Sequence, residues 1–511
     1  MSAPQGPEQY GSYVGRVARG AGVSSFGQGV GKVLGFLTQL ALAWMFGAAQ
    51  YGYYVLGVTV VQLANILSQI GMDNGVVRYV ARYHAEGDVA RVRGTIIQAV
   101  RVTFVASVLL SAAIFFGSGL IAELTDKPFM ETVLRYFALS LPFMTLMSMT
   151  MWAAQGFQTI KYATLVQQVY RPFLTLVFVF VFYLLGFQIL GAVVAYVLSM
   201  AVGAALGLYY LRRVYPKLTD RSVPPKYETR ELFSVSGPMI LSNFSQYINT
   251  WISVAALGLF APVQAAGVYN ISSRTAQLCA LVLIAFTRIF SPMISSLHTR
   301  GLLQDLSRLY QDVSRWTFTG SLAVFLLIAT LSRDILLVFG ERFTEGVVVM
   351  VIIAGAHLFG SSVGHTGRIL AMTGHQNKVL LATASSAAIG FVLSFTLVPA
   401  YGIYGAGVAT ATAIMTLNVI TLYYVRRQFG FWPYNREYLR PVAAGLAAAA
   451  SVPLGKVLLP VPEGFFSVLV FGAVFGLSYL GLLVAFGLGE SDREFLRSLW
   501  NAVRRNLRMG A

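Results

Sequence analysis

The chain has 511 residues, of which 56% are hydrophobic and only 11% are charged, and its mean hydropathy is +0.68. Soluble proteins carry about a quarter charged residues and divide at this length into domains with polar surfaces, so the composition excludes a soluble enzyme. The net charge of +17 fits loops beside an anionic leaflet, and we expect no nucleic-acid partner.

Apolar runs between charged or Gly/Pro breaks predict an all-α, polytopic membrane protein with about 14 transmembrane helices. In chain order, the expected spans are residues 23–46, 52–72, 95–118, 132–153, 164–186, 191–211, 235–259, 266–290, 316–338, 347–371, 379–399, 405–425, 441–460 and 466–488. The tail Ser491–Arg508 is expected to form an amphipathic helix on the membrane surface, because its apolar side chains share one face. Residues 1–20 lack a basic start and a short apolar core, so we expect no signal peptide.

The basic residues predict the orientation of these spans. With the N-terminus inside, 26 lysines and arginines fall in cytoplasmic segments, two fall outside, and nine lie within spans. Cytoplasmic loops are enriched in basic residues, so we expect both termini to be cytoplasmic in a protein of the plasma (inner) membrane. The loops are too short for a catalytic domain and lack a phosphate-binding GxxxxGK[ST] motif, so we expect no enzyme activity. A single cysteine, Cys279, indicates no multi-cysteine metal site, and we expect no metal or cofactor.

Landmarks in the first half recur in the second half at a nearly constant offset. FGAAQYGYY (46–54) matches FAPVQAAGVY (260–269), so that Gly52 and Gly267 lie 215 residues apart. Such an offset covers six spans, an even number, so both halves enter the membrane from the same side. The sequence therefore predicts two parallel six-helix lobes, residues 1–218 and 235–428, joined by a basic cytoplasmic linker at 219–234. Helices 13 and 14 would occupy 429–488, and a cytoplasmic amphipathic tail 489–511.

Polar side chains recur at helical spacing on four spans, so that each set lies on one helix face. The sets comprise Ser25, Gln28, Lys32 and Gln39 on the first span, Gln62, Asn65 and Gln69 on the second, Ser242, Gln246 and Asn249 on the seventh, and Asn270, Arg274 and Gln277 on the eighth. The first and seventh spans are equivalent in the repeat, as are the second and eighth. Buried amides often only join helices by hydrogen bonds, but the symmetric pairing favours a shared hydrated cavity.

Two basic residues lie on these polar faces, Lys32 and Arg274. A charge within a span costs several kcal/mol unless it faces a cavity or a partner. Of the 20 acidic residues, only Asp73 and Asp334 fall near spans. A basic cavity that lacks acids indicates an anionic ligand.

The segment GMDNGVVRYVARY (71–83) and the following EGD (86–88) resemble the polysaccharide-biosynthesis flippases of the multidrug/oligosaccharidyl-lipid/polysaccharide exporter superfamily. Two six-helix lobes with two extra helices are similar to the lipid II flippase branch. The resemblance implies a V-shaped transporter whose central cavity is lined by helices 1, 2, 7 and 8. It also implies that Lys32, Arg78 and Arg274 hold the lipid pyrophosphate and that helices 13 and 14 form a groove for the lipid tail. Lys32 stands where an arginine is typical, and lysine cannot make a bidentate contact.

The resulting hypothesis is a flippase that moves a polyprenyl-pyrophosphate-linked oligosaccharide from the inner to the outer leaflet by alternating access. Lys32, Arg78 and Arg274 would bind the phosphates, and no residue is catalytic. Amide side chains would bind sugar hydroxyls, namely Gln28, Gln39, Asn65, Gln69, Gln246, Asn249 and Gln277. The expected partners are this substrate and membrane lipids, with the monomer as the functional unit. The alternatives are a lipid II flippase, a drug/cation antiporter of the same superfamily, which the missing acids disfavour, and a membrane sugar polymerase or ligase, which would need a large outer loop.

Overall fold

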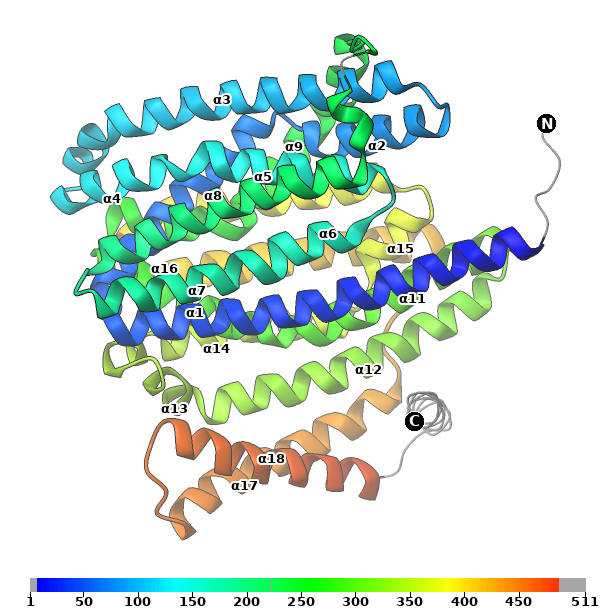
Figure 1. Ribbon diagram of the computed structural model, residues 1–511. Coiled ribbons are helices and arrows are strands. Elements are labelled where there is room, and N and C mark those ends of the chain that lie inside the picture. The colour runs from blue at the N-terminus through cyan, green and yellow to red at the C-terminus, as the bar shows by residue number, and fades with distance from the viewer. Residues whose placement is uncertain (1–6, 221, 487–511) are drawn as a thin grey trace, which may run out of the picture. The chain divides into compact units, whose positions relative to one another are not determined.

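The computed structural model is built from helices (Figure 1). It describes residues 7–220 and 222–486, with side chains except at 7–26, 219, 229–240, 242, 288 and 289, and no strand occurs in these ranges. The predicted all-α class is therefore confirmed. The predicted tail helix Ser491–Arg508 lies outside the described residues. Contacts divide the chain into two compact units, Met1–Gly267 and Val268–Ala511.

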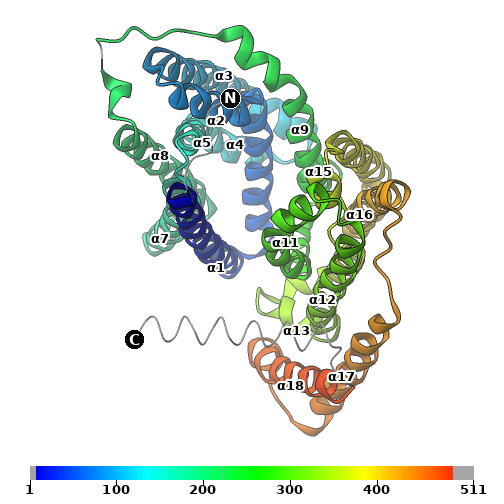
Figure 2. The same ribbon diagram turned by 90° about the vertical axis from the view of Figure 1, so that its right-hand side faces the viewer.

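The first unit holds nine complete helices in its described residues, and α10 runs from it into the second unit. The bounds are α1 (Pro7–Gln69), α2 (Met72–Ala85), α3 (Val89–Leu124), α4 (Pro128–Ala138), α5 (Ser140–Gly156), α6 (Ile160–Thr164), a π-helical segment (Leu165–Tyr170), α7 (Arg171–Leu184), α8 (Ile189–Val214), a 3-10 turn (Pro216–Thr219), α9 (Thr229–Phe260) and α10 (Val263–Ala276). In Figure 2, α7 and α8 lie side by side.

The second unit continues with shorter pieces and one long helix. The bounds are a 3-10 turn (Gln277–Ala280), α11 (Leu281–Thr299), α12 (Leu303–Thr330), α13 (Ser332–Leu337), a 3-10 turn (Glu341–Gly346), α14 (Val347–Val363), α15 (Thr366–Met372), α16 (Gln376–Phe429), a 3-10 turn (Arg436–Tyr438), α17 (Leu439–Leu458) and α18 (Phe465–Ala485). The two final helices lie side by side, as Figure 2 shows.

Two of the helices contain bends at glycine. Gly47 in α1 has φ +70° and Gly402 in α16 has φ +54°, a left-handed backbone that glycine adopts without steric cost. Eleven segments among the described residues are long and apolar enough to cross a membrane, including Gly27–Gln69 and Gln376–Phe429 with 43 and 54 residues. About 20 residues suffice for one crossing, so each of these two bent segments is long enough to cross twice. The chain is a polytopic membrane protein, and the count of 14 spans stays a prediction.

Small and hydroxylated residues hold the first unit together. A Cβ at Gly203 of α8 would lie 2.6 Å from Met147 Sδ of α5, so the glycine leaves room for this side chain between the two helices. Between α1 and α5, the Ser68 and Thr145 hydroxyls are 3.0 Å apart. Such contacts supply attraction between membrane helices, for which lipid provides no hydrophobic driving force.

Helix α9 packs on α1 and α2 and belongs to the first compact unit. Tyr247 of α9 donates a hydrogen bond to the Thr59 carbonyl of α1 (2.8 Å). Lys127 donates a hydrogen bond to the carbonyl of Gly258 (2.7 Å). A helical carbonyl usually accepts from the N–H four residues later, but that residue is Pro262, which has no N–H. Burial lowers the pKa of Lys127. The lobe bounds derived from the repeat stay a prediction.

The linker between α8 and α9 is fastened to the beginning of α3. Arg93, which is buried, donates to the carbonyls of Leu218 (3.1 Å) and Val223. The Lys226 N–H donates to the Ala90 carbonyl (3.0 Å), and the Lys226 carbonyl lies directly against Gly94. These hydrogen bonds hold the linker against the beginning of α3, and we call the linker from Leu218 to Lys226 the strap.

In the second unit, an ion pair joins α13 to the two final helices. Asp334, only 2% exposed, accepts a hydrogen bond from Lys456 of α17 and another from the Gly464 N–H at the start of α18 (3.3 Å). Burial of a charge costs free energy because the charge loses its water, and the attraction between the Asp334 carboxylate and the Lys456 ammonium offsets that cost. The pair anchors α17 and α18 to the rest of the unit.

Candidate functional site

The two repeat landmarks around Gly52 and Gly267 meet at a tight helix crossing within the first unit. A Cβ at Gly52 would overlap the Val263 carbonyl, and a Cβ at Gly267 would lie 2.6 Å from the Ala48 carbonyl oxygen. Gly52 and Gly267 are 215 residues apart, and so are Ala48 and Val263. The repeat therefore relates the Gly52–Val263 contact to the Gly267–Ala48 contact. Only glycine allows the backbones of α1 and α10 to come so close.

A second landmark of the predicted repeat, His84-Ala-Glu-Gly87 in the first half and His298-Thr-Arg-Gly301 in the second, forms the same turn in both halves. Gly87 and Gly301, 214 residues apart, have φ +73° and +74°. The Asp88 N–H donates to the Tyr83 carbonyl (3.0 Å), and the Leu302 N–H donates to the Leu297 carbonyl (3.0 Å). Both are helix ends closed by a left-handed glycine. The two segments thus have the same local structure, as a repeat requires. Asp88 of the EGD segment also caps α3.

A third repeated motif was not among the predicted landmarks. YYLRRVY (209–215) recurs as YYVRRQF (423–429), again at an offset of 214. His84 contacts Tyr215 edge-on at 6.1 Å, and His298 contacts Phe429 edge-on at 6.1 Å. The signal that identifies the motif is the paired tyrosines followed by paired arginines at the end of a helix.

Lys32 is exposed on α1, with Gln28 and Gln39 half-buried along the same helix. Gly27 and Gly31, beside these positions on the helix, pack closely, because a Cβ at Gly27 would overlap Thr164 and one at Gly31 would overlap the Gln168 carbonyl of the neighbouring segment. That segment is the π-helix Leu165–Tyr170, a rare geometry that occurs often at functional sites. The polar residues of α1 therefore lie next to the glycines that contact this π-helix.

Of the residues predicted to line a cavity from the second span, Asn65 and Gln69 differ in burial and in contacts. Asn65 is buried, and its amide oxygen accepts a hydrogen bond from the Thr145 hydroxyl of α5 (3.1 Å). It therefore joins two helices inside the first unit, as buried amides commonly do. Gln69, at the end of α1, is half-buried.

The end of α2 that meets α9 carries a buried acid. Asp73 is 6% exposed, and its Oδ2 accepts a hydrogen bond from Asn243 Nδ2 of α9 (3.0 Å). Gln246 is exposed and Asn249 half-buried on the same helix, and Arg78 is exposed on α2.

In the second unit, Arg274 is exposed on α10 and Gln277 is exposed one turn later. Arg274 lies at the middle of the candidate span Val263–Thr287, and its Nε donates to Asn270 Oδ1 (3.3 Å). A guanidinium at mid-span is costly against hydrocarbon, so this position requires polar groups, water or a negative charge around it. Lys32 and Arg274 belong to different units, each with its own polar face.

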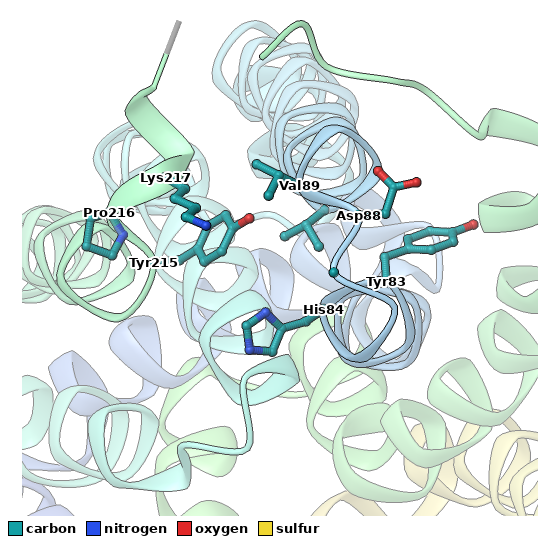
Figure 3. A pocket seen from close by; sticks show the side chains of 9 residues that line it. Tyr83, His84, Asp88, Val89, Tyr215, Pro216 and Lys217 are labelled. Atoms are coloured by element: carbon teal, nitrogen blue, oxygen red, sulfur yellow. The ribbon is translucent and has the colours of Figure 1, made fainter. Parts of the chain in front are cut away.

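A cavity of about 290 Å³ opens at the end of the first unit, between the start of α3 and the residues that follow α8 (Figure 3). Its lining includes Tyr83, His84, Asp88, Tyr215 and Lys217. Tyr215 stacks on Phe157 at 4.8 Å, and burial raises the pKa of Tyr215. Among the described residues, no three His, Cys, Asp or Glu side chains come together as a metal site would require.

Comparison with known proteins places this fold and its motifs in a family. The family model described as polysaccharide biosynthesis protein matches residues 17–298. A probable low-salt glycan biosynthesis flippase of Haloferax volcanii is 26% identical over 208 residues, 40% of this chain and 44% of that protein. This match thus covers less than half of the archaeal relative. Stage V sporulation protein B of Bacillus subtilis is 21% identical over 418 residues, 76% of this chain and 80% of that protein.

Solved structures share the fold at low identity. The lipid II flippase MurJ in an inward closed conformation has a TM-score of 0.71 at 14% identity, covering 91% of this chain and 98% of that one. An inward-facing multidrug resistance MATE family transporter of the MOP superfamily has a TM-score of 0.66 at 16% identity, covering 78% and 94%. The chain shares the fold of these two transporters. The family model covers more than half of the sequence, and the chain belongs to the polysaccharide biosynthesis protein family.

Proposed function

We propose that this chain is a flippase that moves a polyprenyl-pyrophosphate-linked oligosaccharide from the inner to the outer leaflet of the plasma membrane by alternating access. Both termini would lie in the cytoplasm, and the monomer would be the functional unit. The substrate head would occupy a hydrated cavity while the polyprenyl tail stays in lipid.

The observation that carries this proposal is the exposed Arg274 at the middle of a candidate span. An arginine there is stable where polar groups, water or a negative charge surround it, and its planar fork of donors suits phosphate oxygens. Asn270, which accepts from its Nε, orients the guanidinium. Lys32 is the second exposed cation on a polar face, and Arg78 a third, exposed on α2.

The exposed and half-buried amides supply hydrogen-bonding groups for sugar hydroxyls. Gln246 and Gln277 are exposed, and four others are half-buried, namely Gln28, Gln39, Gln69 and Asn249. Asn65 is occupied by Thr145, so we assign it to helix packing instead.

The relatives support a lipid-linked substrate. A probable glycan flippase is among the sequence relatives. The lipid II flippase fold covers 91% of the chain and the MATE transporter fold 78%, which favours a lipid-linked substrate over a drug. Lipid II remains the second candidate, because it carries the same pyrophosphate that Arg274 would bind.

Binding to the purified chain in nanodiscs tests the proposal. Arg274→Ala should weaken binding of a polyprenyl-pyrophosphate-linked oligosaccharide by about 10- to 100-fold, because a charged hydrogen bond contributes about 1.5–3 kcal/mol. Lys32→Ala should weaken it by about tenfold. Arg101→Ala removes an exposed arginine from α3 and should bind as the unaltered chain does. Equal affinities for Arg274→Ala and Arg101→Ala would refute the site, and tighter binding of lipid II in competition would favour the second candidate.

A further inference from the structure

One face of α16 carries an exposed apolar stripe that ends at an arginine. Met415, Val419 and Tyr423 follow one another at a spacing of four residues, which places them on one helix face, and they are 42%, 51% and 53% exposed. Arg427 continues the same spacing and is also exposed. We call these four residues the α16 stripe. An exposed apolar face on a helix long enough to cross a membrane contacts lipid.

The length of the helix places Arg427 at the level of the lipid headgroups. From the bend at Gly402 to the end of α16 at Phe429, the helix rises by about 40 Å at 1.5 Å per residue. The hydrocarbon core of a bilayer is only about 30 Å thick, so a crossing of this length extends beyond it. Met415 lies near the middle of this part of α16. The stripe therefore runs from the centre of the bilayer to its surface.

The arginine at the end of the stripe is held in place by the tyrosine one turn before it. Arg427 Nη1 donates a hydrogen bond to the Tyr423 hydroxyl (2.9 Å). A guanidinium carries five N–H groups, and phosphate accepts two parallel hydrogen bonds from it. Tyr423 therefore fixes the Arg427 side chain and leaves it the donors that phosphate recognition requires.

Two further cations flank Arg427. Neighbouring residues of a helix are about 100° apart, so Arg426 and Gln428 lie on either side of the stripe. The Arg426 guanidinium lies over the Trp432 ring, 4.7 Å from its centre, and on the other side Lys378 Nζ donates to Gln428 Oε1 (2.7 Å). Tryptophan is enriched where membrane proteins meet the headgroups, and the exposed Trp432 fits this level.

No carboxylate neutralises these cations among the residues that the structure describes. Lys378, Arg426 and Arg427 take part in none of the ion pairs within the described ranges. The carboxylates of Asp312 and Glu437, in the same unit, pair with Arg315 instead. Three positive charges at the headgroup level are thus available to a negative group.

We propose that the α16 stripe and its flanking cations bind one anionic phospholipid of the membrane. The Arg427 guanidinium holds the phosphate, Arg426 and Lys378 add attraction, and an acyl chain lies along Val419 and Met415. Basic residues beside a membrane surface attract anionic headgroups. A soluble phosphate compound would meet the same charges but would leave the apolar stripe uncovered. The site uses none of the residues assigned to substrate binding, so its test does not depend on the proposed function.

Native mass spectrometry of the purified full chain in detergent measures the affinity for phosphatidylglycerol, which is anionic, and for phosphatidylcholine, which has no net charge. The unaltered chain should bind phosphatidylglycerol at least about tenfold more tightly. Arg427→Gln should weaken that binding by about tenfold, because hydrogen bonds to charged groups are the strong ones. Arg300→Gln is the matched control. Arg300 is exposed at the end of α11 with Ser296 one turn before it, and the variant should bind as the unaltered chain does.

A second variant tests the role of the tyrosine hydroxyl. Tyr423→Phe should weaken phosphatidylglycerol binding by about fivefold, as expected for the loss of a neutral hydrogen bond. In the Arg427→Gln background it should cause no further loss, because Tyr423 acts through Arg427 and the two effects are coupled.

Glycerol phosphate, which carries a headgroup phosphate without acyl chains, should not displace phosphatidylglycerol at equal concentration. Displacement would show a site for soluble phosphate and would overturn the proposal. Equal losses of binding in Arg427→Gln and Arg300→Gln would show diffuse attraction to a basic surface and would overturn it too, as would equal affinities for the two lipids.

Discussion

Gly52→Val should destabilise the first unit by roughly 1–3 kcal/mol or more, because the new side chain would overlap the Val263 backbone, which cannot rotate away. The helices would have to separate at the crossing that the repeat duplicates through Gly267. A protein that cannot form this crossing should also lose transport. Thermal unfolding followed by intrinsic fluorescence measures the first effect directly.

Gly35→Val is the matched control, because Gly35 lies on the same helix with no atom within 4 Å of an added Cβ. It should unfold close to the temperature of the unaltered chain. If Gly52→Val and Gly35→Val unfold at the same temperature, the close crossing of α1 and α10 is wrong.

Gly94→Val should release the strap between α8 and α9 from α3. The Lys226 carbonyl lies so close to Gly94 that no side chain fits between them, and the hydrogen bond from the Lys226 N–H to the Ala90 carbonyl would be lost as well. The released segment should be cut by trypsin at Lys217 and Lys226 at least about tenfold faster, because proteolysis follows the population of the opened segment.

Gly117 offers the comparison on the same helix, since a Cβ there would meet nothing within 4 Å. Gly117→Val should be cut at the rate of the unaltered chain. Cleavage of Gly94→Val at that same rate would contradict the strap and would indicate that the linker is already open in solution.

The sequence predicted the features that depend on composition and periodicity. The membrane class and the all-helical fold follow from hydropathy, and the internal repeat follows from landmarks such as Gly52 and Gly267, which allow two helix backbones to approach closely. The exposed positions of Lys32 and Arg274 also agree with the polar faces read from helical spacing.

Features that depend on tertiary partners could not be predicted in this way. Asn65 has the same spacing as its neighbours on the polar face, but it is buried and accepts a hydrogen bond from Thr145, which lies 80 residues away in the sequence. Lys456 and Asp334 are 122 residues apart, and nothing in local pattern pairs them. Pro216 and Gly430 occupy equivalent positions after the motif that both halves share, but Pro216 begins a 3-10 turn beside a cavity, whereas Gly430 has φ +72° and is followed by the buried Phe431.

Transfer of substrate across a bilayer tests the central claim most directly. The full chain is reconstituted in liposomes that contain a polyprenyl-pyrophosphate-linked oligosaccharide with a fluorescent head, and a membrane-impermeant quencher reports the head groups that reach the outer surface. The account predicts transfer well above that of protein-free liposomes, its loss in Arg274→Ala, and its retention in Arg101→Ala. Transfer no faster than in protein-free liposomes, or transfer by Arg274→Ala at the rate of the unaltered chain, would contradict it.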